Sequence, residues 1–135
     1  MTLEFVSRWF NRLPEYERDL PLLLVNGVAY TPRVALQEVM RGTALGARLQ
    51  ALIETGRFGT PLQDEVALAK IRLKTLLTRY PPDKPIVATI GTPQLPGKTY
   101  TPRELIEEIE RETAVGKQWI QGEIARMKSL MALRR

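Results

Sequence analysis

The stretch GVAYTPRVALQEVMRGTALG, residues 27–46, recurs seventy positions later as GKTYTPRELIEEIERETAVG, residues 97–116. Ten of the twenty aligned positions are identical, and three more pairs exchange one aliphatic side chain for another: Leu36 with Ile106, Val39 with Ile109 and Leu45 with Val115. Self-similarity of this kind is typical of an internal duplication. The sequence therefore predicts a single domain over residues 1–135 with two strand-turn-helix units, about 22–56 and 85–120, related by a pseudo-two-fold axis.

Each copy contains a helix start. Thr31-Pro32 and Thr101-Pro102 combine a capping threonine with a proline at the first helical position, where its missing N–H costs no hydrogen bond. Residues 22–30 form two short extended segments about an Asn26-Gly27 turn, and residues 85–90 are rich in β-branched side chains. We expect the strands of both copies to pair in one small sheet, and the second copy to continue as one helix toward Arg135, bent at Gly116 or Gly122.

Two more helices complete the expected fold. Apolar residues at helical spacing predict an N-terminal helix from a Thr2 cap to Pro14. A Thr60-Pro61 start and the Pro81-Pro82 stop delimit a bridging helix over residues 61–80. The fold class is therefore helix-rich α+β.

Small residues end the apolar stripe of both repeated helices. Thr43 and Gly46 in the first copy correspond to Thr113 and Gly116 in the second. Small side chains allow another backbone to approach closely, so we expect the two helices to cross near Gly46 and Gly116. The alternative is that each glycine only marks a helix end or bend.

The composition excludes several kinds of chemistry. The 135 residues include no Cys and no His, so disulfides, cysteine zinc sites, thiol nucleophiles and the commonest general base are absent. Sequence motifs for phosphate-binding loops, dinucleotide sites and serine hydrolases are also missing. We expect a protein that is not an enzyme and that uses no cofactor or metal.

The net charge of +5 is spread along the chain and favours anionic partners in general. The longest apolar run, Leu22 to Val25, is too short to span a bilayer, and the first twenty residues do not look like a signal peptide. We therefore expect a cytoplasmic protein with no membrane contact.

The paired arginines Arg33 and Arg103 are candidate partner-binding residues. Each stands in the first turn of its helix, where a cation is mildly unfavourable, so an anionic group of a partner is one explanation. The alternative is a local interaction: an ion pair from Arg103 to Glu107, a hydrogen bond from Arg33 to Gln37, or an arginine laid over Tyr30 or Tyr100.

Charged and aromatic side chains give further candidates. Lys70, Arg72 and Lys74 form a basic cluster, and the second copy is more acidic than the first, with Glu104, Glu107 and Glu108 among its carboxylates. An acidic face against a basic one on a neighbouring copy would give a head-to-tail assembly; the alternative is a solvated helix face. Trp9 and Trp119 are candidate interface residues near the chain ends, with burial in the core as the alternative.

The pattern favours a small structural or assembly protein that forms a homo-oligomer or docks into a larger complex. The alternative is a DNA-binding or other nucleic-acid-binding protein that uses the basic helix and the paired arginines. A strand followed by two helices, present twice, is similar in outline to a tandem ribbon-helix-helix DNA-binding protein. Val25, Val28 and Ala29 depart from that pattern, because they leave the strand short of polar base-reading side chains.

Overall fold

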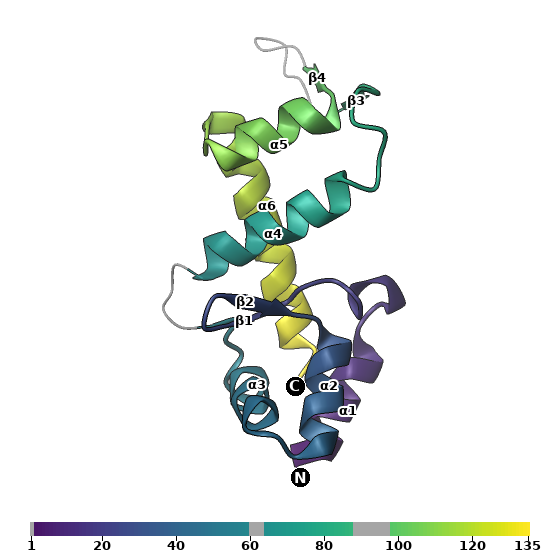
Figure 1. Cartoon of the computed structure of the whole chain (residues 1–135), viewed down its shortest axis with the longest axis vertical. Helices are drawn as coiled ribbons and strands as arrows, with labels where there is room; N and C mark the ends of the chain where they lie inside the picture. The colour runs from purple at the N-terminus through teal and green to yellow at the C-terminus, as the bar shows by residue number, and fades with distance from the viewer. Residues whose placement is uncertain (1, 60–63, 88–97) are drawn as a thin grey trace.

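The structure is a computed structural model that describes residues 2–59, 64–87 and 98–135. It is a helix-rich α+β fold with two groups of helices at opposite ends of an elongated molecule (Figure 1). The N-terminal group holds α1 (Thr2–Arg12), the short 3₁₀ helix η1 (Glu15–Glu17), α2 (Pro32–Arg41) and α3 (Ala44–Thr55). The C-terminal group holds α4 (Asp64–Leu77), α5 (Pro102–Glu110) and the start of α6 (Ala114–Ala132).

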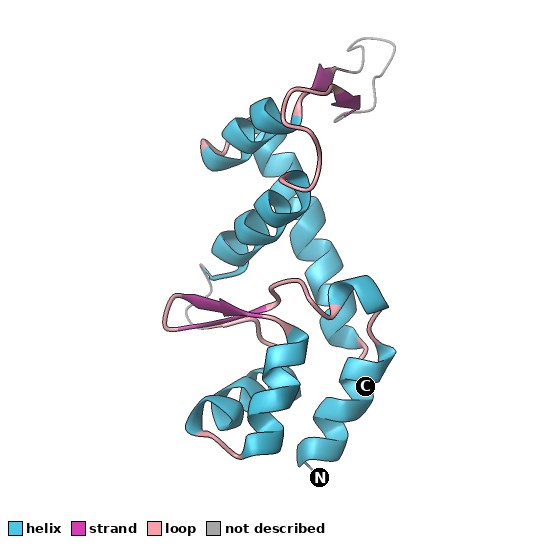
Figure 2. Ribbon diagram, turned by 45° about the vertical axis from the view of Figure 1, so that its right-hand side comes forward, coloured by secondary structure: helices cyan, strands magenta, loops and turns pink. Residues whose placement is uncertain are grey.

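Helix α6 joins the two groups, since it starts beside α5, crosses α4 and ends beside α1 (Figure 2). At that end the indole Nε1 of Trp9 donates to the Leu130 carbonyl at 3.1 Å. The Arg12 guanidinium donates to the carbonyls of Leu133 and Arg135 at 2.9 and 2.6 Å. One continuous core of buried aliphatic and aromatic side chains runs through both groups. Among the described residues, no helix is long and apolar enough to cross a membrane.

The strands form two separate antiparallel hairpins. In the first, β1 (Leu23–Val25) pairs with β2 (Val28–Tyr30); in the second, β3 (Ile86–Val87) pairs with β4 (Thr99–Tyr100). The expected common sheet is therefore wrong in the described part of the chain, where each strand pairs within its own hairpin. The Asn26-Gly27 turn is confirmed, with the positive φ angles of 51° and 78° that a tight hairpin turn requires. Residues 88–97, which include the second half of the predicted strand over 85–90, lie outside the described residues.

The predicted helix starts at Thr31 and Thr101 are confirmed. The Thr31 hydroxyl accepts from the Val34 N–H at 3.1 Å, and the Thr101 hydroxyl accepts from the Glu104 N–H at 3.1 Å. The Thr60-Pro61 start lies outside the described residues. In the part described, α4 begins at Asp64 and ends at Leu77, a few residues before the predicted end.

The expectation of one continuous helix in the second copy is wrong. The chain breaks between α5 and α6, where Glu112 has a φ of 51° and the Thr113 hydroxyl accepts from the Gly116 N–H. The first copy breaks in the same place, with Thr43 accepting from the Gly46 N–H. Threonine followed by glycine three residues later therefore forms a corner between two helices.

The glycines of these corners have a different neighbour from the one predicted. A Cβ on Gly46 would overlap the Glu38 carbonyl of α2, and a Cβ on Gly116 would overlap the Glu108 carbonyl of α5. The two corners lie at opposite ends of the molecule (Figure 1). The expected crossing of the repeated helices at Gly46 and Gly116 is therefore wrong, because each glycine lets its helix approach the one just before it.

Candidate functional site

The predicted basic cluster on α4 is paired with acidic groups of the same chain. The Lys70 ammonium lies 2.7 Å from a Glu112 carboxylate oxygen, and the Lys74 ammonium lies 2.5 Å from a Glu110 oxygen. These contacts lower the pKa of both glutamates. The sequence suggested that basic and acidic surfaces of neighbouring copies contact each other. In the structure, some of these basic and acidic side chains pair within one chain, between α4 and the α5–α6 corner.

Arg72 is fully buried, in contrast to its expected place in an exposed cluster. Its guanidinium donates to Glu17 at 2.7 Å, to Glu123 at 2.8 Å and to the Pro21 carbonyl at 2.8 Å. Glu17 belongs to η1 and Glu123 to α6. Arg72 therefore holds the two helix groups together from within, and its side chain is inaccessible to a partner.

Arg126 extends this network to the surface. Its Nε donates to the second carboxylate oxygen of Glu17 at 2.6 Å, and it also donates to the Tyr16 hydroxyl. The hydrogen bond to Glu17 raises the pKa of Arg126 above its ordinary value. Two carboxylates and two guanidiniums thus form a neutral cluster, as the low dielectric of a protein interior demands.

The paired arginines each form an ion pair within the chain, as the local alternative expected, but the partner is an aspartate and not Glu107 or Gln37. Arg33 forms a two-pronged contact with Asp19 at 2.7 and 3.3 Å, and Arg103 lies 3.4 Å from Asp83. The Arg33 hydrogen bond lowers the pKa of Asp19. Both arginines stay largely exposed, with side chains 45% and 63% accessible.

The three predicted acidic residues have different surroundings. Glu104 closes a capping box, because its carboxylate accepts from the Thr101 N–H, and this bond lowers its pKa. Glu108 is half-buried and its carbonyl accepts from the Thr113 N–H, whereas Glu107 is exposed on α5. Among the residues described, no three acidic side chains gather as a metal site would require.

The two tryptophans differ as well. Trp9 is fully buried under α6, as the core alternative predicted, so it is not accessible to a partner. Trp119 is half-buried, and it lines a hollow described below.

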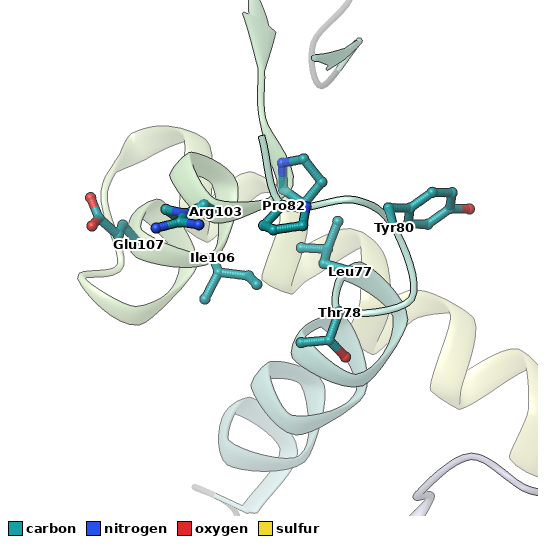
Figure 3. Close-up of a pocket in the computed structure, with 8 residues that line it drawn as sticks. Leu77, Thr78, Tyr80, Pro82, Arg103, Ile106 and Glu107 are labelled. Atoms are coloured by element: carbon teal, nitrogen blue, oxygen red, sulfur yellow. The ribbon is translucent and has the colours of Figure 1, made fainter. Parts of the chain in front are cut away.

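A groove of about 380 Å³ opens between the end of α4 and the start of α5. Figure 3 shows Leu77 and Ile106 on facing sides of it, with Arg103 and Glu107 along the α5 side. Pro82 and Pro102 also line it, and most of the lining surface is apolar. The groove therefore combines an aliphatic floor with an accessible guanidinium and a carboxylate at its rim.

A second hollow, of about 340 Å³, lies between α4, β3 and α6 and is lined by Leu73, Leu76, Ile86 and Trp119 among others. Leu77 and Tyr80 line both hollows. Tyr80 is 55% exposed, and its ring points away from the groove (Figure 3). We call Tyr80 and the two hollows beside it the Tyr80 surface.

Arg103, Glu107 and Trp119 of the Tyr80 surface were candidates from the sequence, whereas Tyr80, Leu77 and Ile106 were missed. The available signal was Tyr80 itself, an aromatic residue at the end of the predicted helix 61–80 and directly before two prolines. No family model, no curated protein and no solved structure matches this chain. An inference about its function therefore rests on the residues described above.

Proposed function

We propose that this chain is a non-enzymatic assembly protein, which docks onto a protein partner or a second copy of itself through the Tyr80 surface. The observation that carries the proposal is the pair of apolar hollows on either side of an exposed tyrosine. Concave apolar surfaces with a few polar groups at the rim are typical of binding sites, and tyrosine is enriched in protein interfaces.

The distribution of charge supports protein docking over the nucleic-acid alternative. Lys70 and Lys74 are paired with glutamates and Arg72 is buried, so the helix expected to bind phosphate offers few accessible cations. Arg33 and Arg103 lie beside aspartates, which repel a phosphate group. The hairpins also differ from the ribbon-helix-helix outline, because β1 pairs with β2 of its own copy.

We also propose that the chain consists of two related units, each a helix, a hairpin and two further helices. Matching contacts in the two helix groups support this relationship. The Arg33 N–H donates to the Arg18 carbonyl and the Arg103 N–H to the Pro82 carbonyl, at 3.1 and 3.3 Å. The threonine caps and the corner glycines match in the same way. On this proposal α1 and α4 are equivalent, although their sequences differ.

The test of docking is the mass of the protein in solution by light scattering, with absorbance at 260 and 280 nm recorded together. We expect a mass above 15.4 kDa, free of nucleic acid, which Tyr80→Ser returns to that of one chain. Met40→Ser is the control, because Met40 is 64% exposed on α2, away from the Tyr80 surface. Bound nucleic acid that is lost steeply with salt would support the alternative function.

A single-chain mass for the native protein would overturn self-association and leave docking onto another protein. That case is tested in cells with a photo-crosslinking amino acid at position 80 and, as control, at position 40. We expect a discrete crosslinked partner from position 80 and none from position 40. Equal crosslinking from both positions would contradict a role for the Tyr80 surface.

A further inference from the structure

Arg33 and Arg103 hold the same position in their helix groups. Each lies in the first turn after a capping threonine, and the backbone N–H of each donates to the turn after the preceding helix. The side chain of each contacts an aspartate of that turn. What lies beside Arg33 in the N-terminal group therefore indicates what fits beside Arg103 in the C-terminal group.

An aromatic ring fills the space beside Arg33. Phe10 of α1 is buried, with the guanidinium carbon of Arg33 5.4 Å from its ring centroid and that of Arg18 4.9 Å from it. Guanidinium groups at this distance from a ring are attracted by its negative face. The N-terminal group thus closes the space between α1 and α2 with a ring that belongs to the chain itself.

The C-terminal group lacks this ring. Phe10 lies on α1, whereas α4 contains no aromatic residue. Pro82 stands where the N-terminal group has Arg18. Within residues 2–59, 64–87 and 98–135, no aromatic ring is in contact with the Arg103 guanidinium. A groove of about 380 Å³ lies open beside Arg103, and its lining includes Leu77, Pro82 and Ile106.

We propose that this groove receives an aromatic side chain from the docking partner, which places its ring beside the Arg103 guanidinium as Phe10 lies beside Arg33. Leu77 and Ile106 contact the edge and the second face of the ring. The Arg103 contact with Asp83 is longer than that of Arg33 with Asp19, 3.4 against 2.7 Å. Little attraction to Asp83 is therefore lost when the Arg103 guanidinium moves over a ring. This inference rests on the proposed docking function and names the side chain that the groove takes.

The test uses three small probes on the full chain: N-acetyl-phenylalaninamide, its cyclohexylalanine analogue and N-acetylglycinamide. The cyclohexyl ring has nearly the size and apolar character of phenylalanine but no π face, so it isolates the contribution of the guanidinium. Binding is followed by NMR from the methyl groups of Leu77 and Ile106 and from the Arg103 Nε–H. We expect saturable shifts with the phenylalanine probe, weaker binding of the cyclohexyl probe and no binding of the glycine probe.

Matched variants locate the interaction. Arg103→Met keeps the apolar stem and removes the guanidinium, and we expect it to weaken the phenylalanine probe roughly 2- to 30-fold. Arg33→Met makes the same change at the position already occupied by Phe10, and we expect it to leave the titration unchanged.

The outcomes separate this inference from the docking function. Equal binding of the phenylalanine and cyclohexyl probes, with no effect of Arg103→Met, would overturn the aromatic preference and leave an apolar docking groove. Failure of every probe to shift Leu77 and Ile106 would overturn the groove as a binding site. Docking elsewhere on the Tyr80 surface would then still show in the solution mass and in crosslinking from position 80.

Discussion

Arg72 and Glu17, which are 55 residues apart in the chain, form a 2.7 Å ion pair in which neither side chain is more than 1% exposed. Glu17 lies in the N-terminal group and Arg72 in the C-terminal group. Buried ions are costly to desolvate and are tolerated when geometry and additional hydrogen bonds satisfy them. The pair therefore fixes how α4 sits against the turn after α1, and with it the relation of the two groups.

Loss of Arg72 is expected to destabilise the protein strongly. Arg72→Met leaves Glu17 and Glu123 without their shared cation, which costs about 3–5 kcal/mol in the free energy of unfolding. Urea denaturation followed by tryptophan fluorescence measures it. Lys74→Met is the control on the same helix, because its half-exposed pair with Glu110 contributes less than about 1 kcal/mol. Similar losses for the two variants would contradict the buried network.

The glycine corner gives a second prediction. Gly116→Ala forces a Cβ into the Glu108 carbonyl, and we expect a loss of about 1–3 kcal/mol in the free energy of unfolding. Gly122→Ala is the matched control in the same helix, since nothing lies within 4 Å of its added Cβ. Because alanine is the better helix former, that change is expected to stabilise by up to about 1 kcal/mol. Thermal unfolding of both variants compares them directly.

The contact between Lys74 and Glu110 makes stability depend on pH. The Lys74 ammonium lowers the pKa of Glu110 in the folded chain, so this contribution is present above the ordinary pKa of a glutamate and is lost as the pH falls through the lowered value. Carbon-detected NMR titration measures the pKa of Glu110 directly. We expect Lys74→Met to raise it toward its ordinary value while the pKa of Glu104, set by the Thr101 N–H, stays low. A rise in the pKa of both Glu110 and Glu104 would contradict a local effect of Lys74 on Glu110 alone.

Trp9 ties the first helix to the last. Trp9→Phe removes the buried bond from Nε1 to the Leu130 carbonyl and part of the ring volume, at an expected cost of about 1–3 kcal/mol. Leu3→Ala is the control on the same helix, because Leu3 is 41% exposed and its loss should change stability by less than about 0.5 kcal/mol. Chemical denaturation monitored by circular dichroism avoids dependence on the altered fluorophore. A negligible effect of Trp9→Phe would show that the α1–α6 contact is secondary.

Local signals in the sequence were sufficient for much of the fold. Capping by Thr31 and Thr101 depends on residues three positions apart, and the Asn26-Gly27 turn on two adjacent ones, so both could be predicted. The break before α6 was missed because Glu112, unlike Gly42 in the first copy, does not favour a positive φ. The position of this break follows from the match between Thr43 and Thr113, which is part of the sequence repeat.

The candidate site depends on contacts between residues that are far apart in the sequence, and no local sequence pattern predicts such contacts. Arg72 lies between two lysines in the sequence, but its helical position turns it inward, toward carboxylates 55 and 51 residues away. Glu110 belonged to the acidic face that was predicted to meet another copy, because its partner within the chain, Lys74, is 36 residues distant. The groove beside Arg103 is lined by residues of α4 and α5 that are far apart in the sequence, and its contrast with the Phe10–Arg33 contact became visible once the two helix groups could be compared.

The long helix α6 also influences the order in which parts of this protein fold during synthesis. Most chains fold their N-terminal parts first as they leave the ribosome. Here Trp9 and Arg12 bind carbonyl groups of residues 130–135, which are made about 120 residues later. The contact between α1 and α6 therefore forms only after residues 130–135 have left the ribosome, and until then that side of α1 is uncovered.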